Sequence, residues 1–156
     1  MLTGRQIVDL YMDNGLPART SVHIADSGYG LPARTWLAND FPNFFKDMLG
    51  RMGITKWTPR WDCDNYAMAY FSLAQLAHYQ TIGSDAEGLA VGVVYYMAGA
   101  RAEGGGGGGH AINTAVIKED NGYKVVFIEP QYAAMGRSCI VELTQAEIDS
   151  IWFLNF

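Results

Sequence analysis

The sequence predicts an α+β domain in which helices come first and a mainly antiparallel sheet follows. Three observations lead to this prediction. Apolar residues recur at helical spacing in three stretches before residue 81, four apolar runs of strand character follow residue 88, and an Asn-Gly pair joins the second run to the third. Because Asn-Gly is typical of a tight hairpin turn, we expect these two strands to pair antiparallel.

The first two helices are expected at residues 3–14 and 40–50. Thr3 is a suitable N-cap for the first, and Gly15 stands where a glycine commonly ends a helix. Gly50 closes the second helix in the same way. These two segments predict N-terminal helices joined by a region rich in loops.

A longer helix is expected from Cys63 to Gln80. Pro59 ends any element before it, and apolar residues such as Tyr66 and Tyr70 then recur at spacings of three and four. The spacing predicts a long, largely buried central helix that begins at or beside Cys63.

Four strands are expected after this helix. Their sequences are LAVGVVYYMAG (89–99), HAINTAVIKE (110–119), YKVVFIEP (123–130) and SCIVEL (138–143). Thr144 and Glu147 then form the capping-box pattern of a short last helix. The helices pack on the sheet in this prediction, and residues 1–156 make a single domain.

Composition and charge exclude several classes of partner. The 156 residues carry a formal net charge of -5 with only 11 Lys and Arg, so we expect no nucleic-acid partner. No apolar stretch is long enough to span a membrane, and the N-terminus does not have the pattern of a signal peptide. We therefore expect no membrane partner and a cytoplasmic location by default, and the oligomeric state stays open.

Cys63 is the first candidate for chemistry because it begins a helix. Unpaired backbone N–H groups and the helix dipole favour negative charge there, and the thiolate is the form of cysteine that acts as a nucleophile. A nucleophilic thiol also needs a base to take its proton, and the base needs a partner that fixes its tautomer.

His110 and Glu129 are the candidates for these two roles. His110 begins the second strand, and Glu129 ends the third, so both should lie at the open end of the hairpin. The arms differ in length, since 11 residues separate His110 from Asn121 and 7 separate Gly122 from Glu129. This mismatch predicts a bulge or a longer loop.

Each of these residues also has an ordinary structural interpretation. A cysteine at a helix start is often a small core residue, and a histidine or glutamate at a strand end is often a surface residue. What favours chemistry is the joint order along the chain: a helix-initial Cys, a strand-initial His, and an acid at the end of the next strand.

Three blocks carry a family resemblance: WDCDNYAMAYF, GHAINTAVI and VVFIEPQ, between residues 61 and 131. They resemble the cysteine, histidine and acid blocks of the papain-like and transglutaminase-like cysteine peptidase superfamily, most closely the C-terminal peptidase domain of the fairy-ring-mushroom agglutinin. The resemblance implies Cys63 as nucleophile, His110 as general base and acid, Glu129 as the acid that orients it, and Gln131 as a further polar residue of the site. Strand parity also places Gln131 on the face of Glu129.

The function implied is that of a cysteine hydrolase, a thiol protease with a catalytic triad acting on a peptide or protein substrate through a thioester intermediate. Two alternatives stay open: a transglutaminase-like acyl transferase with the same triad, and a non-catalytic binding or structural module that keeps the fold.

The chain also departs from the papain pattern. No glutamine lies between residues 51 and 62, so the donors of an oxyanion hole must come from elsewhere, and Trp57 is the preferred candidate beside Gln131. Asp62 and Asp64 flank the thiol and should oppose thiolate formation unless they cap the helix or bind a cation. The sequence requires no cofactor, but the resemblance implies calcium dependence with a Ca²⁺ site at Asp62 or Asp64.

Other features of the sequence give weaker indications of function. Cys139 is expected on a buried strand position without chemistry, and the remaining histidines lack the spacing of zinc ligands. The glycine run 104–109 is either a mobile loop over the site or a low-complexity or engineered spacer.

Overall fold

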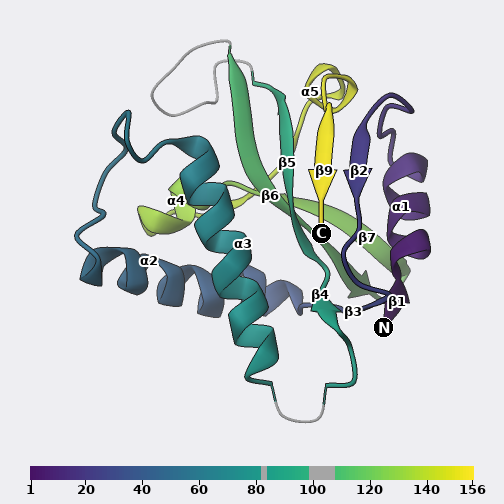
Figure 1. Cartoon of the computed structure of the whole chain (residues 1–156), viewed down its shortest axis with the longest axis horizontal. Helices are drawn as coiled ribbons and strands as arrows, with labels where there is room; N and C mark the ends of the chain where they lie inside the picture. The colour runs from purple at the N-terminus through teal and green to yellow at the C-terminus, as the bar shows by residue number, and fades with distance from the viewer. Residues whose placement is uncertain (82–83, 99–107) are drawn as a thin grey trace.

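A computed structural model describes residues 1–81, 84–98 and 108–156 of the chain (Figure 1). The elements in chain order are β1 (Leu2–Thr3), α1 (Gly4–Asp13), β2 (Ser21–His23), β3 (Gly28–Gly30), the π-helix η1 (Trp36–Asp40), α2 (Phe41–Arg51), α3 (Cys63–Tyr79), β4 (Gly88–Leu89), β5 (Val91–Met97), β6 (Gly109–Glu119), β7 (Gly122–Ile128), α4 (Pro130–Ala134), β8 (Ile140–Val141), α5 (Gln145–Asp149) and β9 (Phe153–Asn155).

The strands form two sheets. The larger sheet has the order β2-β9-β5-β6-β7-β8, and a small one has the order β1-β3-β4. In the larger sheet β2 and β9 are parallel and the other neighbours are antiparallel. The predicted hairpin is confirmed, since β6 and β7 pair up to Glu119 opposite Gly122. The two turn residues are Asp120 and Asn121, so the Asn-Gly pair lies one residue later than a central Asn-Gly turn would place it, and Gly122 begins β7 with a φ of 121° that favours glycine.

Helices cover both faces of the larger sheet. In Figure 1, α2 and α3 lie on one side of it and α1 on the other. Side chains of β6 point alternately to the two faces of the sheet. Ile112 and Val116 pack in the core that includes α1. Ala115 and Ile117 pack in the core that includes α2 and α3. Since successive side chains of a strand point to opposite faces, burial on both sides explains the near-continuous apolar sequence of β6.

Two stripes of α3 are buried, which accounts for its largely apolar sequence. Tyr66 and Tyr70 belong to the core that includes α2. Ala67, one residue round the helix, packs against Val93 of β5. Asn113 of β6 fastens the helix to the sheet, because its Nδ2 donates to the carbonyl oxygens of Ala67 (2.9 Å) and Gly92 (3.1 Å). The start of α3 therefore has a fixed place over the sheet.

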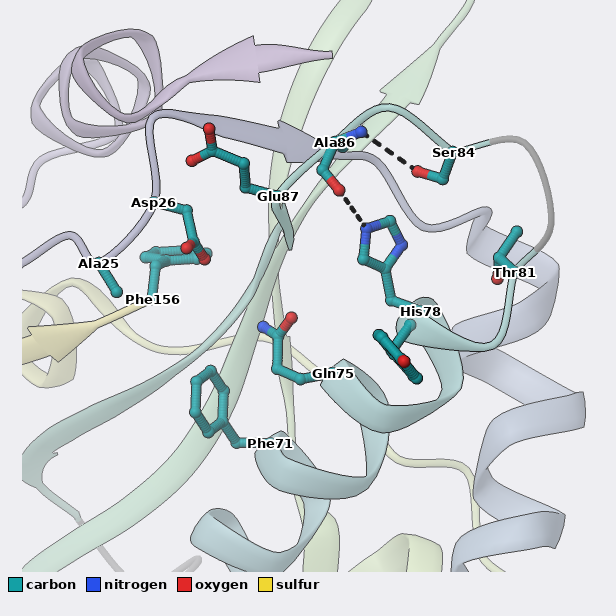
Figure 2. A pocket seen from close by; sticks show the side chains of 11 residues that line it. Ala25, Asp26, Phe71, Gln75, His78, Thr81, Ser84, Ala86, Glu87 and Phe156 are labelled. Carbon is teal, nitrogen blue, oxygen red and sulfur yellow. Dashed lines mark hydrogen bonds between the residues drawn. The ribbon is translucent and has the colours of Figure 1, made fainter.

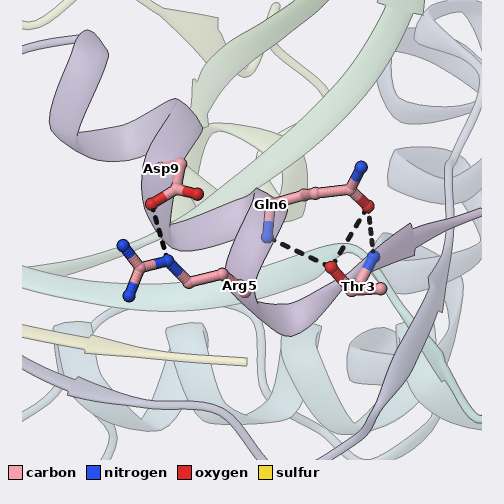
Figure 3. Close-up of polar contacts among 4 residues, drawn as sticks. All are labelled: Thr3, Arg5, Gln6 and Asp9. Atoms are coloured by element: carbon pink, nitrogen blue, oxygen red, sulfur yellow. Dashed lines mark hydrogen bonds and ion pairs between the residues drawn. The ribbon is translucent and has the colours of Figure 1, made fainter.

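The start of α1 shows how local sequence sets a helix boundary (Figure 3). The Thr3 hydroxyl accepts from the backbone N–H of Gln6 at 3.3 Å, and the Gln6 side chain accepts from the backbone N–H of Thr3 at 2.9 Å. This capping box satisfies two backbone donors that the helix leaves unpaired. The nearby pair of Arg5 and Asp9 is solvent-exposed and adds little stability.

The predicted arrangement of helices first and sheet afterwards is wrong. The N-terminal third contributes strands β1, β2 and β3, and the C-terminal run 152–156 supplies β9, which lies between β2 and β5 in the larger sheet. These strands are two or three residues long. Such strands are too short to show an alternating pattern in sequence, and they form only because distant segments supply their hydrogen-bond partners.

No helix among residues 1–81, 84–98 and 108–156 has both the length and the apolar character needed to cross a membrane.

Candidate functional site

Cys63 is the first residue of α3, and its side chain is partly exposed. A tight loop leads into the helix: Thr58 and Trp61 exchange two backbone hydrogen bonds of 3.1 and 2.9 Å. Asp62 takes the N-cap position with an extended backbone, and its N–H donates to Asn65 Oδ1 at 3.2 Å. The predicted helix start at Cys63 is therefore confirmed, and the thiol lies beside the unpaired N–H groups of the first turn.

His110 and Glu129 form a buried pair. His110 Nε2 lies 2.8 Å from Glu129 Oε2, and the two side chains are 1% and 0% exposed. The ring of Tyr96, opposite His110 in the β5–β6 register, packs edge-on against the imidazole with 5.8 Å between centroids. The predicted meeting of His110 and Glu129 is confirmed.

The mismatch in arm length needs neither a bulge nor a longer loop. The β6–β7 register is continuous from Glu119 opposite Gly122 to Asn113 opposite Ile128. Beyond it, the first residues of β6 pair only with β5, and the chain leaves β7 at Glu129 to enter α4. The Glu129 side chain can therefore reach along β6 to His110.

The pKa of His110 reports what surrounds the ring. Burial by itself would lower it, but hydrogen bonds with Cys63 and Glu129 and the negative charges of these two groups raise the pKa to about 9. His110 is therefore an imidazolium at neutral pH. Nε2 faces Glu129, which leaves Nδ1 as the ring nitrogen for the thiol. Thus the structure brings Cys63, His110 and Glu129 together.

Glu129 is held from both sides. Its Oε1 accepts the backbone N–H of Gln131 at 3.2 Å, and its own N–H donates to the carbonyl oxygen of Cys139 at 2.8 Å. Pro130 lies at the first position of α4, where a missing N–H costs nothing. Glu129 is thus both the partner of His110 and the N-cap of α4.

Gln131 lies in α4 and not in a strand, so the two-residue parity that placed it beside Glu129 does not apply. It is 1% exposed, and neither atom of its side-chain amide has a hydrogen-bond partner within the described part of the chain. A buried amide without partners is costly unless water or a ligand satisfies it. Its role in the site stays a prediction.

The two tryptophans before the helix differ. Both are half-buried against the core that includes α2 and α3. The Nε1 of Trp61 is buried and has no partner among the residues described, and its ring packs edge-on against Tyr66 at 6.0 Å. Trp61 is therefore a better candidate donor than Trp57, whose role stays a prediction.

Asp62 and Asp64 face each other. A hydrogen bond with the Asp64 side chain raises the pKa of Asp62, and burial and the negative charge of Asp64 raise it further. Two carboxylates fall short of the six to eight oxygen ligands that Ca²⁺ takes. Within the described ranges no group of three or more His, Cys, Asp or Glu residues could hold a metal ion. The described side chains do not fit a calcium site by themselves, and calcium dependence stays a prediction.

Cys139 is the contrasting thiol. It is 1% exposed, and its Sγ donates to the carbonyl oxygen of Leu37 at 3.6 Å. Burial, with a smaller contribution from the charge of Glu129, raises the pKa of Cys139 to about 11. The expected strand position is wrong, because β8 (Ile140–Val141) begins one residue after Cys139, whereas the expected burial is confirmed. The absence of chemistry at this thiol stays a prediction.

Sequence reasoning missed two residues of the site. Tyr96 packs on the His110 ring, and Asn113 fixes α3 over the sheet. Asn113 could have been found, since an amide inside an otherwise apolar strand is unusual. The glycine-run prediction falls mostly on residues 99–107, outside the described residues. Gly109, at its end, pairs with Met97.

No family model matches the chain, and neither does any curated protein. Among solved structures, one of a "PSL1a-E64 complex" matches with a TM-score of 0.70 and 19% identity, covering 99% of this chain and 51% of that one. A structure of the Polyporus squamosus lectin bound to Neu5Aca2-6Galb1-4GlcNAc matches with a TM-score of 0.66 and 18% identity, covering 99% and 49%. The chain thus spans about half of these chains, and the likeness shows the fold.

These comparisons contradict the predicted family. One of the two solved structures that share the fold is of a lectin, so on this comparison the papain-like or transglutaminase-like fold, the agglutinin-peptidase resemblance and the thiol-protease activity are wrong. A peptide or protein substrate has no support either. The physical reason is that three short blocks carried the prediction, and a Cys, His and Glu in contact do not by themselves define a reaction.

Proposed function

We propose that this chain is a ligand-binding module whose site is centred on Cys63, His110 and Glu129, and that its thiol can bond covalently to an electrophilic ligand. The observation that carries the proposal is the buried His110–Glu129 pair, 2.8 Å apart, with Cys63 as the second partner of the imidazole. Burying two ionisable groups is costly. A pair that only stabilised the fold would need no thiol beside it.

The neighbours in fold support binding. One was solved in complex with E64 and the other with a sialylated trisaccharide. E64 is an epoxysuccinyl compound, and thiolates open epoxides. We therefore propose that an epoxide of this class reacts with the present chain at Cys63.

The residues divide the reaction between them. The Cys63 thiolate attacks one epoxide carbon, and the carbon–oxygen bond breaks with its electron pair staying on oxygen. His110, which holds the proton taken from the thiol, donates it to that oxygen. The product is a β-hydroxy thioether, and no oxidant or reductant is needed. Glu129 keeps the ring oriented and charged.

Gln131 and Trp61 suit the polar end of such a ligand. Both carry buried N–H donors without partners in the described residues. A buried donor gains most from a negatively charged acceptor, because a charge-assisted hydrogen bond is about twice as strong as a neutral one. We propose that these donors hold the carboxylate of the ligand or the oxygen of the opening epoxide.

The test is alkylation of the chain with an epoxysuccinyl compound, followed by intact-mass measurement and peptide mapping. We expect one adduct per chain, located on Cys63. Cys63→Ser should abolish it and Cys139→Ala should leave it unchanged. An adduct on Cys139, or no loss of rate in His110→Asn, contradicts the proposal.

A second candidate is glycan binding, favoured by aromatic side chains on the sheet. The Tyr95 ring lies 6.3 Å from Trp152 and 5.5 Å from Phe153, measured between centroids, and Trp152 is 42% exposed. Rings of this kind present flat apolar faces with polar edges, a surface against which sugars can pack. Isothermal titration with Neu5Aca2-6Galb1-4GlcNAc tests it: a binding signal lost in Trp152→Ala supports this function, and no signal contradicts it.

A further inference from the structure

A pocket of about 440 Å³ lies beside the C-terminal half of α3 (Figure 2). Figure 2 shows that α3 and distant segments both contribute side chains to it, namely Phe71, Gln75, Asp26, Glu87 and Phe156. Ala67 lies on α3 between this pocket and Cys63, and it is buried against Val93 and Ala111 of the sheet. Packed core therefore separates the pocket from the thiol, and a group attached to Cys63 has to extend in another direction.

Tyr95 of β5 lies beside the thiol. The partly exposed side chains of Tyr95 and Cys63 pack against the same buried group, which consists of Ala67, Val93 and Ala111. Tyr95 is also directly opposite Ala111 in the β5–β6 register, and side chains paired in this way have Cβ atoms about 5 Å apart. The Tyr95 ring therefore lies on the same face of the sheet as the thiol.

The ring of Tyr95 is neutral and has negative surroundings. Burial raises the pKa of the Tyr95 hydroxyl, and the negative charges of Asp64 and Cys63 raise it further. The phenol therefore keeps its proton at neutral pH. A carboxylate placed over this ring would be repelled, whereas an uncharged group would not.

Trp152 and Phe153 extend the aromatic surface that begins at Tyr95. The centroid of the Tyr95 ring is 5.5 Å from Phe153, at an interplanar angle of 82°, and 6.3 Å from Trp152, at 48°. Cη2 of Trp152 lies 3.2 Å from the position that a Cβ on Gly109 would take, so the indole lies against the start of β6, directly before His110. Trp152 is exposed and Phe153 partly exposed. The surface thus runs from the thiol to the strand that carries the imidazole.

We propose that Tyr95, Trp152 and Phe153 form the recognition subsite of the Cys63 site, and that this subsite binds an aromatic group attached next to the electrophilic carbon of the ligand. The inference rests on the proposed function. The surface adjoins the thiol through Tyr95, so the ligand that occupies it is the one that reacts. Rings inclined to one another leave faces and edges for an incoming ring, which aromatic pairs favour over a face-to-face stack.

Two matched probes test the proposal. Both are epoxysuccinyl amides, one with a benzyl group and the other with a cyclohexylmethyl group of similar size and apolar surface. The measurement is the second-order rate constant for alkylation of Cys63, followed by intact mass. We expect the benzyl probe to react about fivefold faster, because an aromatic pair is worth more than the area it buries. At saturating concentrations the two first-order rates should agree, since the ring adds affinity and the epoxide is the same.

Variants locate this preference on the aromatic surface. Trp152→Leu keeps an apolar side chain but removes the ring, so the ratio of the benzyl rate to the cyclohexylmethyl rate should fall toward unity. Tyr123→Leu removes a ring of similar exposure from β7 and should keep the ratio of the unaltered chain. Because the ratio compares two probes on one protein, a general change in thiol reactivity cancels. If Trp152→Leu does not fold, the two probes still decide on the unaltered chain.

The outcomes separate this inference from the function on which it rests. Equal second-order rates for the two probes on the unaltered chain overturn the inference alone, as does a preference that persists in Trp152→Leu. Equal rates together with protection of Cys63 by Neu5Aca2-6Galb1-4GlcNAc would assign the aromatic surface to a glycan instead. No labelling of Cys63 by either probe overturns the proposed function.

Discussion

The two cysteines of this chain have the same side chain in opposite surroundings. Cys63 begins a helix, is partly exposed, and shares a hydrogen bond with a positively charged His110. Cys139 is enclosed by the core, has a backbone carbonyl as its partner, and has its pKa raised to about 11. This difference shows that the reactivity of a thiol depends on the charged groups beside it and on its exposure to solvent. The predictions below test that difference.

The largest expected effect is on thiol selectivity. At pH 7, iodoacetamide should label Cys63 at least about a thousandfold faster than Cys139, because a thiol of pKa about 11 is almost wholly protonated and this one is also buried. Peptide mapping by mass spectrometry over a time course measures both rates. Equal, slow labelling of both cysteines would remove the distinction.

The second-largest effect is expected at Glu129, the acid that keeps His110 charged. Glu129→Gln replaces a carboxylate with a neutral amide, so the pKa of His110 should fall and Cys63 should lose its cationic partner. We expect labelling of Cys63 at pH 7 to slow by about a hundredfold, the order expected when a buried charge loses its partner.

The matched control is Glu142→Gln, which makes the same chemical change on an exposed side chain near β8. It should label at the rate of the unaltered chain. If Glu129→Gln reacted as fast as this control, His110 would not depend on Glu129.

The His110–Glu129 pair should also make stability depend on pH. The folded pKa of about 9 lies above the ordinary 6.5, so the stabilisation is fully present below pH 6.5 and is lost as the pH rises through 9. We expect the free energy of unfolding to fall by on the order of 2 kcal/mol over this range.

Urea titrations at pH 6.5 and 9.5 measure this change. In His110→Gln the fall between the two pH values should largely disappear. A variant that lost stability as steeply as the original chain would assign the pH dependence to other groups.

The smallest effect is expected at the core thiol. Cys139→Ala removes one buried sulfur and should lower the free energy of unfolding by about 1 kcal/mol through the small cavity it leaves. The backbone carbonyl that accepts from Glu129 stays in place. The labelling rate of Cys63 should therefore be unchanged, and a slower rate would show that the two thiols are coupled.

Much of the site could be predicted from the sequence because its signals are local. The apolar spacing after Pro59 placed Cys63 at a helix start, and the Asn-Gly turn placed His110 and Glu129 at one end of a hairpin. Gln131 was misplaced for an equally local reason: strand parity was extended past the point where Pro130 begins α4. The role of Asn113 and the pocket beside Asp26 depend on segments far apart in the chain.

By itself, the sequence determined the helix that begins at Cys63, the β6–β7 hairpin and the meeting of His110 with Glu129. Spacing, turn chemistry and capping act over a few residues, so they can be recognised without a partner. Only the tertiary structure decided that β9 lies inside the larger sheet, that the Gln131 amide is buried without partners among the described residues, and that Asp26 and Glu87 line one pocket. Short strands and pockets owe their existence to contacts between distant segments, and a linear pattern does not record such contacts.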